Sequence, residues 1–355
     1  MSACGPTAAP QSPSTGTPTG PTPRPQTAAP PSGVGGSPSG AANAGPFRIL
    51  GDDPVIRRGV VPQRTAILPS AVAVVDGTYH AWIVAFAGVP GTQDIHHVTS
   101  SDAVTWDVVA DPSLAALSDG FGNPGALPTS VLRDGDSWVM YFTAALDTEP
   151  EAWDIWRATA PGPDGPWTRL DQPVLRRGPA GAWDSGGLDF PTVIRTADSY
   201  LLLYSGSQPA HQDGAIGLAT SEDGLDWQKH DNPATTDALA AESDPVIAPG
   251  LCGAFDAHAV HQPRVVTDGD RLLMAYAGYA APFESQASVG LAESRDSGAT
   301  WGCLWPASAL DTAGLPPGFV HTMVAFPRAG RVALLVEWFM SSGTDVWLAE
   351  AETLP

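Results

Sequence analysis

The sequence predicts an all-β protein, a five-bladed β-propeller with four-stranded blades, and three observations support this fold class. Glycine and proline, 38 and 36 of the 355 residues, are too frequent for long helices. Short strand patterns recur about every 60 to 70 residues, a blade-like period. The first strand pattern, over about 47–56, resembles the outer strand of the second repeat. We therefore expect it to pair with the last blade and close the ring.

The first element is a leader of biased composition. Residues 1–46 contain 11 prolines and 8 glycines, and Arg24 carries their only charged side chain. Such a segment buries too little apolar surface to offset the entropy cost of ordering it. We therefore expect a disordered, partly polyproline-like tether over 1–46 and one folded domain over 47–355.

The chain begins Met-Ser-Ala-Cys-Gly, which resembles the end of a bacterial lipoprotein signal, where the cysteine carries the lipid. The apolar segment that precedes the cysteine in such signals is missing from the sequence. We expect lipidation at Cys4, directly before the tether, and an extracellular or cell-envelope location. The alternative is an ordinary cysteine in a flexible tail.

Charge excludes several classes of partner. The formal net charge of −21 opposes binding to nucleic acid and to anionic membrane surfaces. No apolar run approaches the roughly 18 residues that a membrane-spanning helix needs. We expect a monomer with no nucleic-acid partner and no transmembrane segment.

The blades are predicted from a repeated order of strands. Each of the first four repeats has a proline in its first strand, followed by a turn and a strongly apolar second strand. These prolines are Pro69, Pro128, Pro191 and Pro263. A third strand then leads to a polar turn and a tryptophan. These tryptophans are Trp106, Trp167, Trp227 and Trp301. The fifth repeat lacks the proline and has strand patterns over 320–326, 331–338 and 345–351.

The turn before three of these tryptophans follows the Asp-box pattern Ser-x-Asp-x-Gly-x-Thr-Trp. Residues 294–301 match it, 221–227 are a close variant, and 100–106 are a weaker one. In such a turn the aspartate caps the backbone and the tryptophan packs between sheets. We therefore expect these boxes to be structural. His96 and His97, on the third strand of the first repeat, are expected to be exposed.

The third repeat carries a family resemblance. The segments 183–194, 200–206 and 216–227 resemble five-bladed propeller glycosidases, including glycoside hydrolase families 43, 32, 62 and 68 and the related mannoside phosphorylases. The resemblance implies a site on the central axis, at the face where the innermost strands begin, with a carbohydrate ligand. Glycoside hydrolysis there requires one acid and one base or nucleophile from different blades.

Carried over to this sequence, the resemblance makes Asp189 the general acid, with Phe190 beside it to raise its pKa by desolvation. The family positions for the other carboxylates hold Ile67-Leu68 and Ala126-Leu127 instead. Glu337, in an otherwise apolar strand, and Asp256 are the substitute candidates. The alternatives are a strand-start cap for Asp189, a salt bridge to a nearby arginine for Glu337 and a loop cap for Asp256.

Several polar residues and one aromatic residue are candidates for binding a sugar. They are His258, His261, His321, Arg64, Arg264 and Trp153. Trp153 is expected on a loop above the second repeat, where it could stack on a sugar ring, whereas Trp156 is expected at the start of a strand. The histidines could instead line a wet channel, and the arginines could pair with acids.

No organic cofactor is expected, and a structural central ion such as calcium stays open. Because two carboxylate positions are lost, the chain could also be a non-catalytic carbohydrate- or surface-binding propeller. A sialidase-like enzyme, suggested by the Asp boxes, would need an arginine triad that these 17 basic residues do not supply.

The remaining two cysteines, Cys252 and Cys303, lie at the ends of the fourth repeat. An exported chain would allow them to form a disulfide. The alternative is two free buried thiols.

Overall fold

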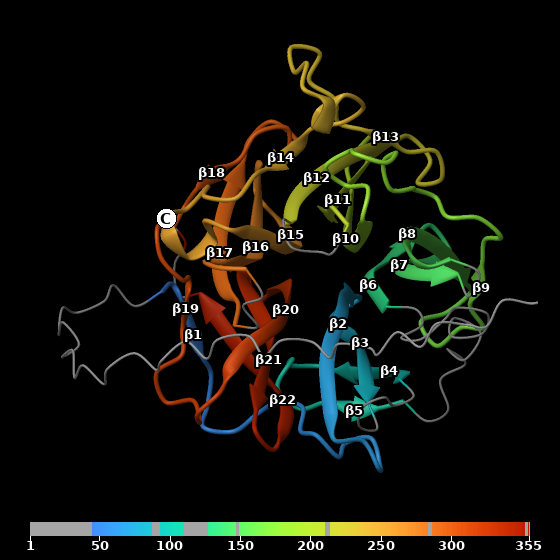
Figure 1. Ribbon diagram of the computed structural model, residues 1–355. Helices are drawn as coiled ribbons and strands as arrows, with labels where there is room; N and C mark the ends of the chain where they lie inside the picture. Colours follow the sequence, from blue (N-terminus) through green and yellow to red (C-terminus); the bar gives the residue numbers. More distant parts are fainter. Residues whose placement is uncertain are drawn as a thin grey trace, which may run out of the picture. The chain divides into compact units, whose positions relative to one another are not determined.

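The computed structural model describes residues 45–86, 93–109, 127–146, 149–209, 214–282, 286–351 and 354. Within the compact unit Asn43–Pro355 these residues form five antiparallel sheets. The sheets are arranged around a centre to which each contributes its first strand (Figure 1). The predicted five-bladed β-propeller is confirmed. The predicted tether and Cys4 lie outside the described residues.

Each blade is a four-stranded meander. Blade 1 comprises β2 (Ala66–Val75), β3 (Thr78–Phe86), β4 (Gln93–Ser100) and β5 (Asp107–Val108). Blade 2 comprises β6 (Leu127–Asp134), β7 (Ser137–Leu146), β8 (Glu149–Ala160) and β9 (Thr168–Arg169). Blade 3 comprises β10 (Gly187–Arg195), β11 (Tyr200–Ser207), β12 (Gly214–Ser221) and β13 (Gln228–Lys229), with β14 (Pro245–Ile247) also paired to β12. Blade 4 comprises β15 (Ala259–Asp268), β16 (Arg271–Tyr279), β17 (Ser288–Ser294) and β18 (Gly302–Cys303).

Blade 5 closes the ring with strands from both ends of the domain. It contains β20 (Phe319–Arg328), β21 (Arg331–Met340) and β22 (Gly343–Ala351), and its fourth strand is β1 (Phe47–Ile49). Phe47 pairs with Ala351, and the short strand β19 (Leu310–Asp311) runs parallel to β1 on the outside. The predicted closure is confirmed, and it leaves β22 without an unpaired edge.

The closing segment and the exit of blade 2 use the same contacts, as their similar sequences predict. The backbone N–H of Arg58 donates to Asp345 at 2.6 Å, and that of Arg177 donates to Asp154 at 2.9 Å. In both blades the acidic residue lies near the start of the third strand. Sequence similarity between 47–59 and 167–178 therefore reflects the same position in two blades.

Neighbouring blades are joined near the axis by hydrogen bonds between their inner strands. The hydroxyls of Ser70, Thr129 and Thr192, each directly after the repeat proline, donate to the carbonyls of Pro128, Pro191 and Pro263 in the next blade. The Gln262 amide donates to the His321 carbonyl, which joins blades 4 and 5. Blades 5 and 1 are joined instead through β22, the third strand of blade 5, where Thr344 exchanges hydrogen bonds with the Ile67 backbone.

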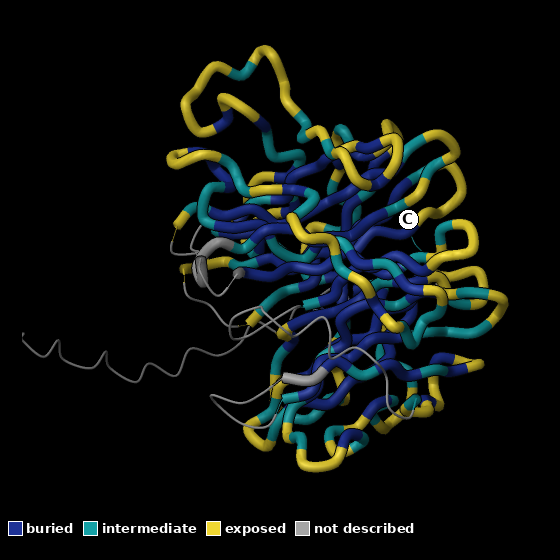
Figure 2. Tube along the Cα trace, turned by 90° about the vertical axis from the view of Figure 1, so that its right-hand side faces the viewer, coloured by how far each residue is buried: buried dark blue, intermediate teal, exposed yellow. Residues whose placement is uncertain are grey.

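The core lies between blades. Figure 2 shows buried strands through the domain and exposed segments at the turns. Large side chains such as Trp82, Tyr204 and Tyr276 are fully buried. Tyr204 and Tyr276 need glycine opposite them, because a Cβ at Gly217 or Gly290 would lie 2.4 or 2.1 Å from the ring. Alternating large and absent side chains thus let adjacent sheets pack closely.

Helix is confined among the described residues to two short 3-10 segments, η2 (Ala238–Ala240) and η3 (Ala254–Asp256). None of the described helices has the length and apolar content to cross a membrane. The predicted pairing of Cys252 with Cys303 is confirmed, with their Cα atoms 5.2 Å apart.

Candidate active site at the propeller axis

The inner strands share an irregularity at one end. The register of β10 shifts between Asp189 and Thr192, that of β15 between His261 and Arg264, and that of β20 between Val320 and Met323. Such bulges bend a strand and re-aim its side chains, and they are common beside active sites. The inner strands of blades 1 and 2 shift register at the same place, between Pro69 and Ala71 and between Pro128 and Ser130. The axial ends of all five blades therefore present side chains differently from a regular strand.

Two of these bulges hold a non-glycine residue in the left-handed region. Phe190 has φ of +51° and Gln262 has φ of +56°, and each directly precedes the repeat proline. Backbone strain of this kind costs about 1–3 kcal/mol and is retained mainly where the surroundings impose it. The residues before them, Asp189 and His261, therefore occupy equivalent positions on adjacent inner strands.

Asp189 is partly buried and lies opposite Ser205 at the start of β10. Its neighbour Phe190 places its ring 5.5 Å from the guanidinium carbon of Arg264, a cation–π contact between blades 3 and 4. The structure therefore places the predicted acid at the predicted face and beside an aromatic ring.

Arg264 crosses the axis beneath this face. Its Nη1 donates to the Thr129 carbonyl in blade 2 at 3.1 Å, although blades 4 and 2 are not neighbours. The side chain is 2% exposed, its Nε has no hydrogen-bond partner, and desolvation lowers its pKa to about 9. Its predicted role in binding sugar hydroxyls is therefore wrong in this arrangement, because its described hydrogen bond goes to buried backbone.

A buried guanidinium on the axis also opposes a cation such as calcium at that point. Among the described residues, no group of three or more His, Cys, Asp and Glu side chains could hold a metal ion.

His321 and Glu337 form a pair in blade 5. The Nδ1 atom of His321 lies 2.9 Å from Oε2 of Glu337. The hydrogen bond to Glu337 raises the pKa of His321, against a smaller opposite effect of burial. Glu337 is buried, whereas the His321 side chain is half exposed. The partner of Glu337 is therefore a histidine, and the expected salt bridge to an arginine is wrong.

Comparisons with known proteins bear on what this face does. The profile of the "Glycosyl hydrolases family 32 N-terminal domain" matches residues 69–243, which span blades 1 to 3. Solved structures that superpose on the chain include a family 32 β-fructofuranosidase from Bombyx mori (TM-score 0.53, 15% identity, 83% of this chain and 64% of that chain). Another is a family 117 glycoside hydrolase from Zobellia galactanivorans (TM-score 0.55, 19% identity, 86% and 89%). The chain therefore shares the five-bladed β-propeller fold of these glycoside hydrolases.

Curated relatives of the chain match over a shorter stretch. The arabinan endo-1,5-α-L-arabinosidase A of Aspergillus aculeatus is 34% identical over 122 residues, 31% of this chain and 35% of the relative. The match thus spans about a third of the length of the curated relatives.

His261 is positioned by a glycine of the neighbouring blade, which the sequence does not indicate as part of the site. Its ring lies 5.9 Å from that of Tyr279 and packs against Gly214 of blade 3, where a Cβ would be 2.0 Å from Nε2. The imidazole therefore leans from blade 4 toward the blade that carries Asp189. The repeat prolines predict that His261 and Asp189 occupy equivalent positions. They do not predict the role of Gly214, because that role depends on a contact between two blades.

Asp256 does not join the axial face. It is fully buried in η3, where it accepts hydrogen bonds from the backbone of Cys252 and Gly253 and from the Tyr276 hydroxyl. Asp184 occupies the equivalent place in blade 3, beside the Tyr204 hydroxyl and paired with Lys229. Asp184 and Asp256 are thus fully buried aspartates that contact a tyrosine hydroxyl in the same way in two blades. Asp256 caps its loop, as the alternative proposed. Its predicted catalytic role is wrong.

The other predicted ligands lie around the inner strands. Arg64 is in the turn before β2, and His258 directly precedes β15. Trp153 lies within β8, so its predicted loop position is wrong. The reason is that the pairing of β7 with β8 extends to Leu146 and Glu149, beyond Trp153. Trp156 is buried in the middle of β8.

The expectation that His97 is exposed is also wrong. Its ring stacks on Trp82 at 4.9 Å and on His80 at 5.2 Å, and its Nδ1 contacts Asp164 of blade 2. His97 therefore packs in the interface between blades 1 and 2. The alternation of polar and apolar residues along its own strand does not predict this contact.

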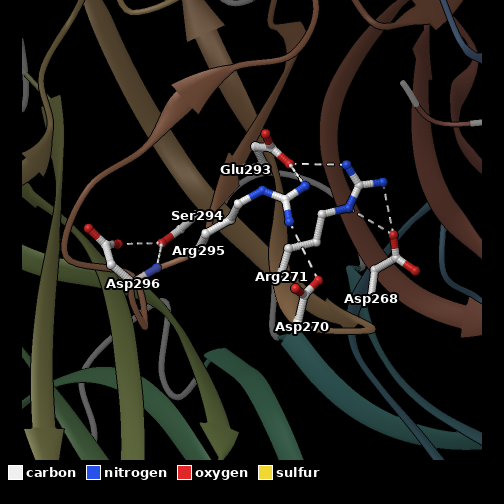
Figure 3. Close-up of polar contacts among 7 residues, drawn as sticks. All are labelled: Asp268, Asp270, Arg271, Glu293, Ser294, Arg295 and Asp296. Atoms are coloured by element: carbon white, nitrogen blue, oxygen red, sulfur yellow. Dashed lines mark hydrogen bonds and ion pairs between the residues drawn. The ribbon is translucent and has the colours of Figure 1, made fainter.

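The Asp boxes are structural, as predicted. Asp102 and Asp223 accept backbone hydrogen bonds within their own turns, which lower the pKa of both carboxyls. Figure 3 shows the box of blade 4, where Ser294 donates to Asp296 beside a separate network of ion pairs. In that network Arg271 contacts Asp268 and Glu293, while Arg295 contacts Glu293 and Asp270. Arg295 and Asp270 are exposed, so this is a network of surface ion pairs, and it does not indicate a catalytic role.

Proposed function

We propose that this chain hydrolyses glycosidic bonds at the axial face, with Asp189 as the general acid. The observation that carries the proposal is the position of Asp189 on the bulged start of β10, equivalent to His261 on the adjacent strand. A carboxyl group there can protonate the oxygen of a leaving sugar.

The second group of the mechanism is the pair of His321 and Glu337. Glu337 is too buried to contact a substrate directly, so it acts through the imidazole. A carboxylate on Nδ1 fixes the tautomer and raises the basicity of the ring, which leaves Nε2 to accept a proton. Water then adds to the anomeric carbon as its proton passes to His321. The glycosidic bond breaks and the leaving oxygen takes the proton of Asp189.

The substrate class we propose is an arabinan or a related neutral furanoside polymer. The relatives described as arabinan endo-1,5-α-L-arabinosidases support it, and so does the net charge of −21, which disfavours polyanionic glycans. We also propose that the chain is exported and monomeric, with a lipid on Cys4; the pairing of Cys252 with Cys303 supports export.

The test is hydrolysis of a panel of aryl glycosides and neutral polysaccharides, arabinan among them. We expect Asp189→Asn to lower the rate at least about 100-fold, since general acid catalysis contributes factors of this size. Asp198→Asn, an exposed change in the hairpin turn of the same blade, is the matched control and should leave the rate unchanged. Equal rates in the parent and Asp189→Asn would remove Asp189 from the mechanism.

The second candidate is a non-catalytic carbohydrate-binding propeller. It is favoured by Ile67 and Leu127, apolar residues at two positions where related enzymes carry acids, and Ile67 is fully buried. Binding of a polysaccharide without hydrolysis of any member of the panel would establish this alternative.

A further inference from the structure

A groove lies away from the axis, between the outer parts of blades 2 and 3. It has a volume of about 640 Å³. One wall is the segment 170–174 that follows β9, and the other is the Asp-box turn 225–228 of blade 3. Leu170 and Leu225, one on each wall, are among the more exposed large apolar side chains of the described residues, at 38% and 40%.

Trp227, on the Asp-box wall, differs from the tryptophans of the Asp boxes in blades 1 and 4. In blades 1 and 4 the indole N–H of the box tryptophan donates to a carbonyl of its own turn, Trp106 to Ala103 and Trp301 to Gly298. Trp227 has no such hydrogen bond. Its ring is also partly exposed, whereas Trp106 and Trp301 are buried.

The cause is Tyr141 of blade 2. Its hydroxyl donates at 2.8 Å to the carbonyl of Gly224, the box residue that matches Ala103, and its ring meets that of Trp227 edge-on at 5.8 Å. The residues at the position of Tyr141 in the other blades carry no hydroxyl; they are Trp82, Leu203, Ala275 and Leu335. Tyr141 therefore takes the carbonyl that the indole N–H of Trp227 would otherwise contact, and Trp227 lines the groove.

The chemistry of the groove suits a sugar. Asp171 and Gln172 on one wall and Asp226 and Gln228 on the other are exposed groups that can hydrogen-bond to hydroxyls. The leucines and the indole offer apolar surface for the C–H face of a sugar ring. Arg176 donates to Gln172 at 2.7 Å, which brings a cation to the wall that carries Asp171. This partly balanced charge favours a neutral ligand over a basic peptide.

We propose that this outer groove is a second glycan-binding site, which holds a neutral polysaccharide while the axial site acts on it. The proposal rests on the proposed function only in naming the polymer that the axial site cleaves. Binding in the groove requires no catalytic residue, so the two proposals fail separately.

The experiment is affinity electrophoresis in gels that contain arabinan, arabinoxylan, fructan or mannan, using the full chain with Asp189→Asn so that the polymer is not consumed. The groove variant is Leu225→Ser with Asp226→Ala and Gln228→Ala, which leaves Trp227 and the packing beneath it in place. The matched control is Val104→Ser with Thr105→Ala, which changes the corresponding exposed positions in the Asp box of blade 1.

We expect at least one polymer to retard the Asp189→Asn protein, with a dissociation constant that rises fivefold or more in the groove variant and not in the control. Equal retardation of the groove variant and its parent by every polymer, or no retardation at all, overturns the proposal. So does groove-dependent binding of a lysine-rich peptide in place of a polymer. Hydrolysis of a small aryl arabinofuranoside, measured with Asp189 intact, should be unchanged by the groove variant. If the parent hydrolyses nothing while groove-dependent retardation persists, the proposed function fails and the groove site stands.

Discussion

The Oε2 atom of Glu337 lies 2.9 Å from Nδ1 of His321, and this contact joins the two inner strands of the last blade at the axial face. Glu337 is 3% exposed, and its equivalents in the other blades are the small residues Ala85, Thr143 and others of similar size. A carboxylate in such a place is costly unless it has a partner. The imidazole is that partner, so the two residues have to be considered as one unit.

Glu337→Gln should therefore lower the pKa of His321. The hydrogen bond to Glu337 raises that pKa in the parent, so its stabilising effect is fully present below the unfolded value near 6.5. This stabilisation is lost as the pH rises through the pKa of His321 in the folded protein. We expect NMR titration of the His321 ring to show the shift, and the difference in stability between parent and variant to shrink with rising pH in this range. An unchanged titration midpoint would contradict the pairing.

Phe47→Ala should destabilise the domain by about 3–5 kcal/mol, the usual cost of removing a fully buried phenylalanine. Phe47 lies on the closing strand β1 opposite Ala351, so its cavity opens where the ring is joined. Urea denaturation measures the change. Arg48→Ala, on the exposed face of the same strand, should stay within about 0.5 kcal/mol of the parent. Equal effects of the two changes would show that the closure does not hold the domain together.

The fold was predictable because it repeats. A proline in each of the first four inner strands and a tryptophan after each of the first four third strands mark the blade period. The similarity of 47–59 to 167–178 marks the seam. These signals survive in a single sequence, since every blade meets the same packing requirement at the same position. The capping by Asp102, Asp223 and Asp296 is local to one turn, and it was predictable for the same reason.

The site was less predictable because its contacts join different blades. Asp189 was found from its place before a repeat proline, but the partner of Glu337 depends on the bulge that turns His321 out of register. Arg264 stands where the first three blades have Ser or Thr, yet only the assembled ring shows that it spans the axis to Thr129. Local sequence patterns do not encode such cross-ring distances.

His97→Gln should make stability less sensitive to acid. Burial lowers the pKa of His97 and of His80 beside it, while Asp164 raises both. The unfolded chain binds protons near pH 6.5 before the folded protein does, so the parent loses stability as the pH falls below that value. We expect urea denaturation at pH 7.5 and 5.5 to give a smaller pH effect for the variant than for the parent. A pH effect as large as that of the parent would exclude His97 as the responsible group.

Removing the disulfide should lower stability by about 2–4 kcal/mol, because Cys252 and Cys303 close a segment of the unfolded chain. The cysteines are 51 residues apart and tie the loop before blade 4 to its outermost strand, β18. Cys252→Ala with Cys303→Ala should unfold at lower urea concentration than the oxidised parent. A reductant should bring the parent to the level of this variant and leave the variant unchanged. If the reductant does not alter the parent while free thiols are detected under denaturing conditions, the two cysteines are not paired in solution.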